Sequence, residues 1–132
     1  MKLLQDKAAL LTGRSRAIGA GIARRFAEQG AAVAFTYRSS SGQAEAIVRE
    51  LEGMGVKAAA YQSDAADFAQ AESLIKNVLD TFGQIDILVN NAGITQDTLM
   101  LRMSEAQWDR VIQTNLKSVF NLTKHALRPM MK

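Results

Sequence analysis

Leu10-Leu11-Thr12-Gly13-Arg14-Ser15-Arg16-Ala17-Ile18-Gly19 is the stretch that decides the fold, because it joins a short apolar strand to an amphipathic helix through small and polar residues. Such a turn leaves the first N–H groups of the helix unpaired, with the positive end of the helix dipole behind them. These groups suit a phosphate. The spacing Gly13-xxx-Ala17-x-Gly19 differs from the G-x-G-x-x-G fingerprint, so by itself it fits a purely structural turn equally well.

The composition indicates a single globular domain over residues 1–132. A chain of this length can bury a hydrophobic core without disulfides or a structural metal. It contains no cysteine, which excludes a disulfide framework, a thiolate metal site and a thiol nucleophile, and favours a cytoplasmic protein. Charged residues interrupt every apolar run well short of a membrane span. We therefore expect no association with a membrane.

The distribution of charged side chains argues against nucleic acid and metal binding. The formal net charge is +3, but lysines and arginines are spread along the chain with acidic residues between them. The carboxylates occur singly, without the spacing of metal ligands, so no metal site is expected. The lone histidine, His125, has no serine or aspartate at a partner spacing and is expected to be structural. Trp108, Met100 and Met103 are likewise expected to contribute to packing.

Strands and helices are predicted to alternate along the chain. Apolar, β-prone runs predict strands over residues 8–12, 31–37, 57–62 and 85–90. Helical spacing follows each strand, with start signals at Ser40-xx-Gln43, Asp67-xx-Gln70 and Ser104-xx-Gln107. This alternation implies a parallel sheet with helices on both faces, a three-layer α/β fold. The last and longest helical pattern carries an apolar set made of Trp108, Val111, Ile112, Leu116, Val119, Phe120 and Leu127.

Three motifs at matching places resemble the short-chain dehydrogenases/reductases. They are Thr12-Gly13-xxx-Ala17-x-Gly19 after the first strand, Asp64 after the third, and Asn90-Asn91-Ala92-Gly93 after the fourth. The sequences of residues 84–95 and 114–120 are similar to those of the bacterial 3-oxoacyl-acyl-carrier-protein reductases within that family. The similarity runs over the whole chain and matches the amino-terminal part of such an enzyme. It implies a Rossmann-like half domain with a four-stranded sheet in the order 3-2-1-4.

The resemblance also implies a nicotinamide cofactor. The pyrophosphate would lie against the turn formed by Thr12, Gly13, Arg14, Ser15, Arg16, Ala17, Ile18 and Gly19. Asp64 and Ala65 would meet the adenine, and Asn91, Ala92 and Gly93 would line the ribose and nicotinamide side.

The choice between the two nicotinamide cofactors depends on charge. Rossmann proteins that prefer NAD place an acid at the end of the second strand. Here that strand ends without one, and Arg38 and Arg16 supply cations suited to a 2′-phosphate. NADP(H), weakly bound, is therefore favoured over NAD(H).

Hydride transfer in the family uses an Asn-Ser-Tyr-Lys tetrad, of which Asn115 matches the asparagine. Neither Tyr37 nor Tyr61 is followed by lysine four residues later, and the serine and the Tyr-xxx-Lys pair of relatives would lie beyond Lys132. A general acid must reach the substrate oxygen, so we expect this chain alone to bind cofactor without reductase activity. An acyl-carrier protein would be a partner only of a full-length enzyme.

The expected strand order leaves the fourth strand at an edge of the sheet. An apolar edge strand invites pairing with another chain, so we expect self-association through this edge, through the last helix, or through both. Two other interpretations stay open. The chain could be a structural, self-assembling half domain without a ligand, or an enzyme completed by a second chain.

Overall fold

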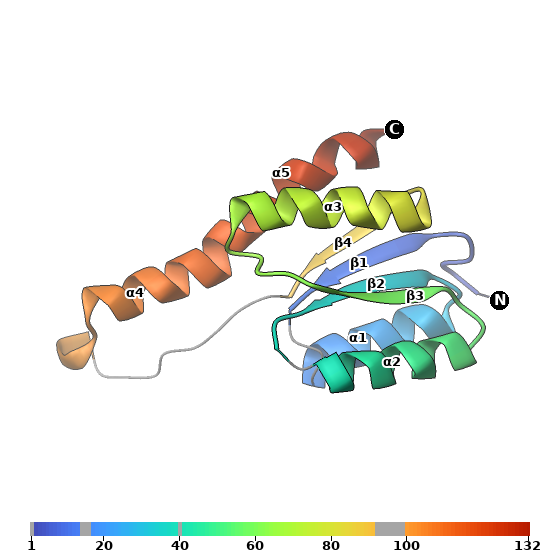
Figure 1. The fold of residues 1–132 in the computed structure, drawn as a ribbon, viewed down its shortest axis with the longest axis horizontal. Helices are drawn as coiled ribbons and strands as arrows, with labels where there is room; N and C mark the ends of the chain where they lie inside the picture. Colours follow the sequence, from blue (N-terminus) through green and yellow to red (C-terminus); the bar gives the residue numbers. More distant parts are fainter. Residues whose placement is uncertain (1, 14–16, 40, 92–99) are drawn as a thin grey trace.

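The computed structural model describes residues 2–13, 17–39, 41–91 and 100–132. Strands and helices alternate through the first two thirds of the chain, and helices follow the fourth strand (Figure 1). The elements, in chain order, are β1 Ala8–Thr12, α1 Ala17–Glu28, β2 Ala32–Tyr37, α2 Ser41–Gly53, β3 Ala58–Gln62, α3 Phe68–Phe82, β4 Ile87–Asn90, a 3-10 turn Met100–Arg102, α4 Glu105–Ile112, a π-helical turn Gln113–Lys117 and α5 Ser118–Met131.

The four strands form one sheet in the order β3-β2-β1-β4, and every neighbouring pair is parallel. The expected fold class and strand order are confirmed. The register pairs Leu10 with Ala34 on one side and with Leu88 on the other, so β1 is the central strand flanked by β2 and β4. All five residues of β1 are buried, as expected for a strand with neighbours on both edges and helices on both faces.

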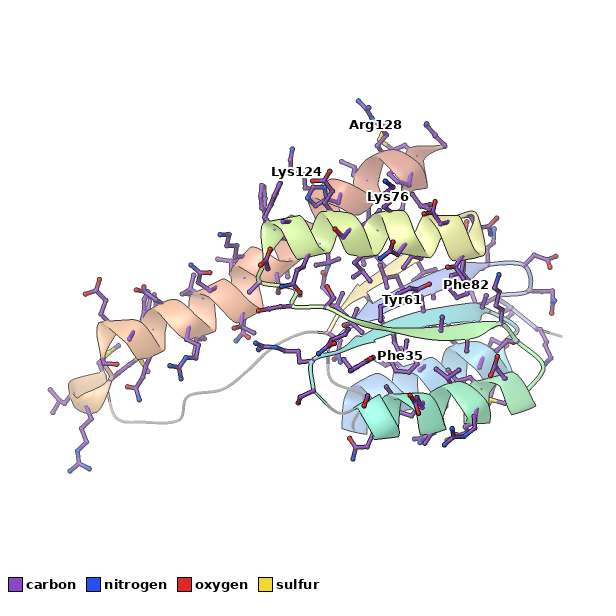
Figure 2. The ribbon with its side chains drawn as sticks, viewed as in Figure 1. Phe35, Tyr61, Lys76, Phe82, Lys124 and Arg128 are labelled. Atoms are coloured by element: carbon purple, nitrogen blue, oxygen red, sulfur yellow. The ribbon has the colours of Figure 1, made fainter. Side chains whose placement is uncertain are left out.

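Each face of the sheet has its own hydrophobic core, with Phe35 in one and Tyr61 and Phe82 packed against the other (Figure 2). Helices α1 and α2 cover one face, and α3 and α5 cover the other (Figure 1). Period-two alternation sends Leu11 of β1 into the first core and Leu10 into the second. A fully buried leucine such as Leu10 contributes about 1.5–3 kcal/mol relative to an exposed one. Arg24 of α1 and Glu50 of α2 also form an ion pair of 2.6 Å at the surface of the first layer.

Two of the predicted helix starts are confirmed. The Asp67 side chain caps α3 by accepting a hydrogen bond from the Gln70 N–H, and Ser104 forms a reciprocal capping box with Gln107 before α4. At the other end of α3, Gly83 has a positive φ of 79°, and its N–H donates to the Leu79 carbonyl. The third predicted start, Ser40, lies outside the described residues, and α2 begins at Ser41.

The region after Ser104 differs from the single regular helix that the sequence pattern predicts. A π-helical turn interrupts the helical run, and α4 extends away from the three layers (Figure 1). Most of the predicted apolar face is solvent-exposed, because α5 packs against α3 and β4 through its other face. Phe120 is 57% exposed, and Trp108 at 52% and Met100 at 77% do not take the packing role expected of them. The residues that α5 buries are Ser118, Asn121, Leu122 and Ala126.

Within the described part of the chain, no helix combines the length and the apolar character needed to cross a lipid bilayer.

Candidate functional site

The carboxyl ends of the strands meet at one edge of the sheet, and the predicted site residues follow these ends. Thr12 at the end of β1 is paired in register with Asn90 at the end of β4, and Tyr37 at the end of β2 with Gln62 at the end of β3. The chain leaves β1 for β2 on one side and reaches β4 on the other. Parallel sheets of this kind bind ligands in the crevice beyond the carboxyl ends at such a reversal of strand order.

Gly13, the residue after β1, adopts a conformation that favours glycine. Its φ is +125°, a region that side-chain-bearing residues rarely occupy. A Cβ atom at this position would lie 2.8 Å from Asn91 Nδ2 and 3.1 Å from the Asn91 backbone carbon and oxygen. Gly13 and Asn91 therefore approach each other closely, and only glycine at position 13 allows this approach.

Hydroxyl groups hold the end of β1 on both sides. The Gly13 N–H donates to Thr36 Oγ1 at 3.0 Å, and the same hydroxyl lies 3.4 Å from the Gly13 carbonyl oxygen, to which it can donate. On the other side, Thr12 Oγ1 donates to the Val89 carbonyl at 3.5 Å. Thr12 and Thr36 are both buried. These contacts fix the backbone at Thr12 and Gly13. Helix α1 begins at Ala17 and Ile18, and Gly19 lines one small cavity together with Gly13 and Thr36.

A basic side chain lies beyond the end of β2. Arg38 is more than half exposed, and its Nη2 is 3.4 Å from Asp64 Oδ2. The Arg38 carbonyl accepts a hydrogen bond of 2.9 Å from Gln62 Nε2, so the backbone at this position is tied to β3. An exposed pair at 3.4 Å is weak, worth about 0–1 kcal/mol, and leaves the guanidinium available to a stronger anion.

The segment after β3 is held by several hydrogen bonds. The Asp64 N–H donates to Gln70 Oε1 at 2.8 Å, and Asp64 Oδ1 accepts from the Ala66 N–H at 3.0 Å. The Ala65 carbonyl accepts a bond of 3.0 Å from Asn121 Nδ2 of α5. The predicted adenine contacts, Asp64 and Ala65, therefore lie in a loop that α3 and α5 both constrain.

Asn115, the predicted remnant of the catalytic tetrad, lies in the π-helical turn and is half-buried. A π turn is rare and is frequent at functional sites. The turn is stabilised by the Ser118 hydroxyl, which donates to the Thr114 carbonyl one turn earlier. His125 lies farther along α5, where its ring packs 4.5 Å from the ring of Phe68.

The structure does not describe every predicted site residue. Arg14, Ser15 and Arg16 of the turn, and Ala92 and Gly93 after β4, lie outside the described residues.

Two structural partners of the site were not predicted from the sequence. In the sequence, Thr36 is an ordinary β-branched residue of a predicted strand, and Asn121 lies within an apolar helical pattern. A polar side chain at an inward-facing position of a buried strand or helix could have indicated both residues, because such a group needs a hydrogen-bond partner.

Known proteins share this arrangement. The family model described as short chain dehydrogenase matches residues 7–132. The 3-oxoacyl-(acyl-carrier-protein) reductase FabG of Staphylococcus aureus is 48% identical over 126 residues, covering 96% of this chain and 51% of that protein. A reductase of the same description from Synechocystis is 45% identical, covering 100% of this chain and 53% of that protein.

Solved structures give the same result. The crystal structure of a short chain dehydrogenase from Burkholderia cenocepacia in complex with NADP superposes with a TM-score of 0.92 at 40% identity, and covers 96% of this chain and 52% of that one. The chain spans about half the length of the relatives that it matches.

Proposed function

Because the chain belongs to the short-chain dehydrogenase family, we propose that residues 1–132 form a single cofactor-binding domain that holds NADP(H) beyond the carboxyl ends of β1, β2 and β4. The observation that carries this proposal is the close approach of Gly13 to Asn91, which leaves no space for a side chain at position 13. A helix that begins shortly after such a glycine suits a pyrophosphate, because the N–H groups and the helix dipole both favour its negative charge.

The preference for NADP(H) over NAD(H) rests on Arg38. An acid at the end of the second strand would accept the ribose hydroxyl of NAD and repel a 2′-phosphate. This chain has Arg38 there, more than half exposed and weakly paired, so its guanidinium can turn to a phosphate. The relative from Burkholderia cenocepacia, whose structure contains NADP, supports the same choice.

We also propose a role in the reduction of a 3-oxoacyl thioester, following the description of the Staphylococcus and Synechocystis relatives. The bound cofactor would supply the hydride. Asn115 is the one residue of this chain that matches the family tetrad, and neither Tyr37 nor Tyr61 has a lysine four residues later. We therefore expect the 132-residue polypeptide alone to bind cofactor without reducing a carbonyl. An acyl-carrier protein would be a partner of an enzyme that also contains the remaining tetrad residues.

The affinity is expected to be lower than that of a complete enzyme. Two or three absent hydrogen bonds, each worth about 0.5–1.5 kcal/mol, would weaken binding by roughly ten- to a thousandfold. The test is a titration of the chain with NADPH and with NADH, followed by the fluorescence of the reduced nicotinamide. Saturable binding with tighter NADPH supports the proposal. If neither cofactor binds saturably at millimolar concentration, the proposal is wrong.

Self-association is a second proposal, favoured by a different observation. Leu116, Phe120 and Leu127 are all more than half exposed, and β4 is an edge strand of the sheet. Apolar surface of this kind is stabilised by burial against another chain. The molar mass in solution, measured by light scattering across a concentration series, tests this proposal, and a monomer at the highest concentration would contradict it.

A further inference from the structure

Asn121 occupies a position where an amide is unfavourable for packing alone. It lies on α5 with no exposed surface, and its Oδ1 has no hydrogen-bond partner among the described residues. A buried polar atom without a partner is destabilising, whereas an apolar side chain at this position would not carry that cost. The side-chain hydrogen bond that Asn121 makes to a described residue therefore indicates what the amide is for.

That hydrogen bond joins two parts of the chain that are 56 residues apart. Asn121 Nδ2 donates to the Ala65 carbonyl at 3.0 Å. Asp64, the preceding residue, has one carboxylate oxygen on the Ala66 N–H and the other 3.4 Å from Arg38. The amide on α5 thus holds the segment from which a carboxylate reaches the arginine proposed to bind the 2′-phosphate.

The same helix also leads back to Asn115. Asn121 lies six positions after Asn115, and the π-helical turn that contains Asn115 is stabilised by the Ser118 hydroxyl, which donates to the Thr114 carbonyl. Ser118 and Asn121 are both buried on the side of α5 that faces the sheet and α3. The helix is therefore attached to the β3–α3 segment on one side and carries the π-helical turn at its start.

We propose that Asn121 is a positioning residue, which fixes the Asp64–Ala65 segment where it contacts the adenosine half of the cofactor. The same hydrogen bond links this segment to α5, which follows the π-helical turn that contains Asn115. The proposal rests on the proposed cofactor site. It assigns Asn121 no contact with the cofactor, because its action passes through the Ala65 backbone.

The test compares Asn121→Leu with the unchanged chain. Leucine keeps the number and branching of the side-chain heavy atoms and removes the donor, and Asn77→Leu on exposed α3 surface makes the same chemical change away from the site. Adenosine 2′,5′-bisphosphate and reduced nicotinamide mononucleotide are titrated separately, so that each half of the cofactor has its own probe. We expect Asn121→Leu to weaken the adenosine probe by about two- to tenfold, the effect of one hydrogen bond, and to leave the nicotinamide probe and the control variant unchanged.

A second measurement does not depend on ligand binding. Amide hydrogen exchange at Ala66 and Asp67 in the free chain should become about two- to tenfold faster in Asn121→Leu, since these N–H groups lie next to the released carbonyl. If Asn121→Leu does not fold, Asn121→Ala is measured in the same way.

The outcomes separate the two proposals. Unchanged exchange at Ala66 and Asp67, or equal weakening of both probes, would overturn the role of Asn121. If the unchanged chain binds neither probe, the proposed cofactor site fails and the adenosine role fails with it, and faster exchange would then show only that Asn121 holds the segment.

Discussion

Replacing Arg38 with alanine should weaken NADPH binding and leave NADH binding nearly unchanged. The guanidinium now faces Asp64 at 3.4 Å, and an exposed pair at this distance is worth about 0–1 kcal/mol, so releasing it for a phosphate costs little. A charge-assisted hydrogen bond to a phosphate is worth about 1.5–3 kcal/mol. The net loss on truncation is therefore about 0.5–3 kcal/mol, which corresponds to roughly a two- to 150-fold rise in the NADPH dissociation constant.

Fluorescence titration of Arg38→Ala with both cofactors measures this effect. Arg49→Ala is the matched control, because Arg49 is an exposed arginine on α2, away from the strand ends. The ratio of the NADH to the NADPH dissociation constant should fall in Arg38→Ala and stay constant in Arg49→Ala. The effect should also shrink at high salt, because exposed charges are screened. Equal weakening of both cofactors would refute the reasoning, since the 2′-phosphate is the group in which they differ.

Four further predictions concern stability and association. Gly13→Ala should lower the free energy of unfolding in urea by about 2–4 kcal/mol, because the residue has a φ of +125° and a Cβ would contact Asn91. Gly21→Ala, in open space on α1, should raise it by about 0.5–1 kcal/mol. Similar values for the two variants would contradict the argument from backbone strain. Asp67→Ala should cost about 0.5–2 kcal/mol through loss of the α3 cap, and Asp80→Ala in the last turn of the same helix should cost nothing. The hydrogen bond and the charge of Glu50 raise the pKa of Arg24, so their stabilisation is present in the neutral range and is lost as pH rises past the ordinary arginine value. Glu50→Gln should cost at most about 1 kcal/mol at pH 7 and nothing measurable in 1 M NaCl. Phe120→Glu should shift light scattering toward smaller species, and Leu3→Glu, which alters another exposed apolar residue near the N-terminus, should not.

The layered fold could be predicted from the sequence because local signals agree with it. β1 and the caps at Asp67 and Ser104 lie where pattern and side-chain chemistry place them. The α5 face could not be predicted, since helical periodicity shows which residues share a face but not which face meets the protein. Packing on α3 and β4 selects the face with Ser118, Asn121 and Leu122, so the larger apolar side chains point to solvent.

The candidate site, too, could be predicted from the sequence only in part. Thr12, Gly13, Arg38, Asp64 and Asn91 follow strand ends, and a parallel sheet must bring strand ends to one edge. The residues that hold them came only from the structure. Thr36 and Asn121 act through hydrogen bonds to residues 23 and 56 positions away, and no local pattern reports a contact across such separations. The roles of these residues toward a cofactor stay predictions.

The π-helical turn at Gln113–Lys117 changes the phase of the helix that contains it. A π turn accommodates one extra residue, and each residue of an α-helix turns the chain by about 100°. On an uninterrupted α-helix, Trp108 would point about 120° away from Phe120 and about 100° away from Leu127. With one residue absorbed, these angles fall to about 20° and 0°, so the three exposed side chains align along one line. Deleting a single residue between 113 and 117 would therefore convert this run into a regular α-helix and leave these angles at about 20° and 0°, so the exposed apolar side chains would stay in line without the π turn.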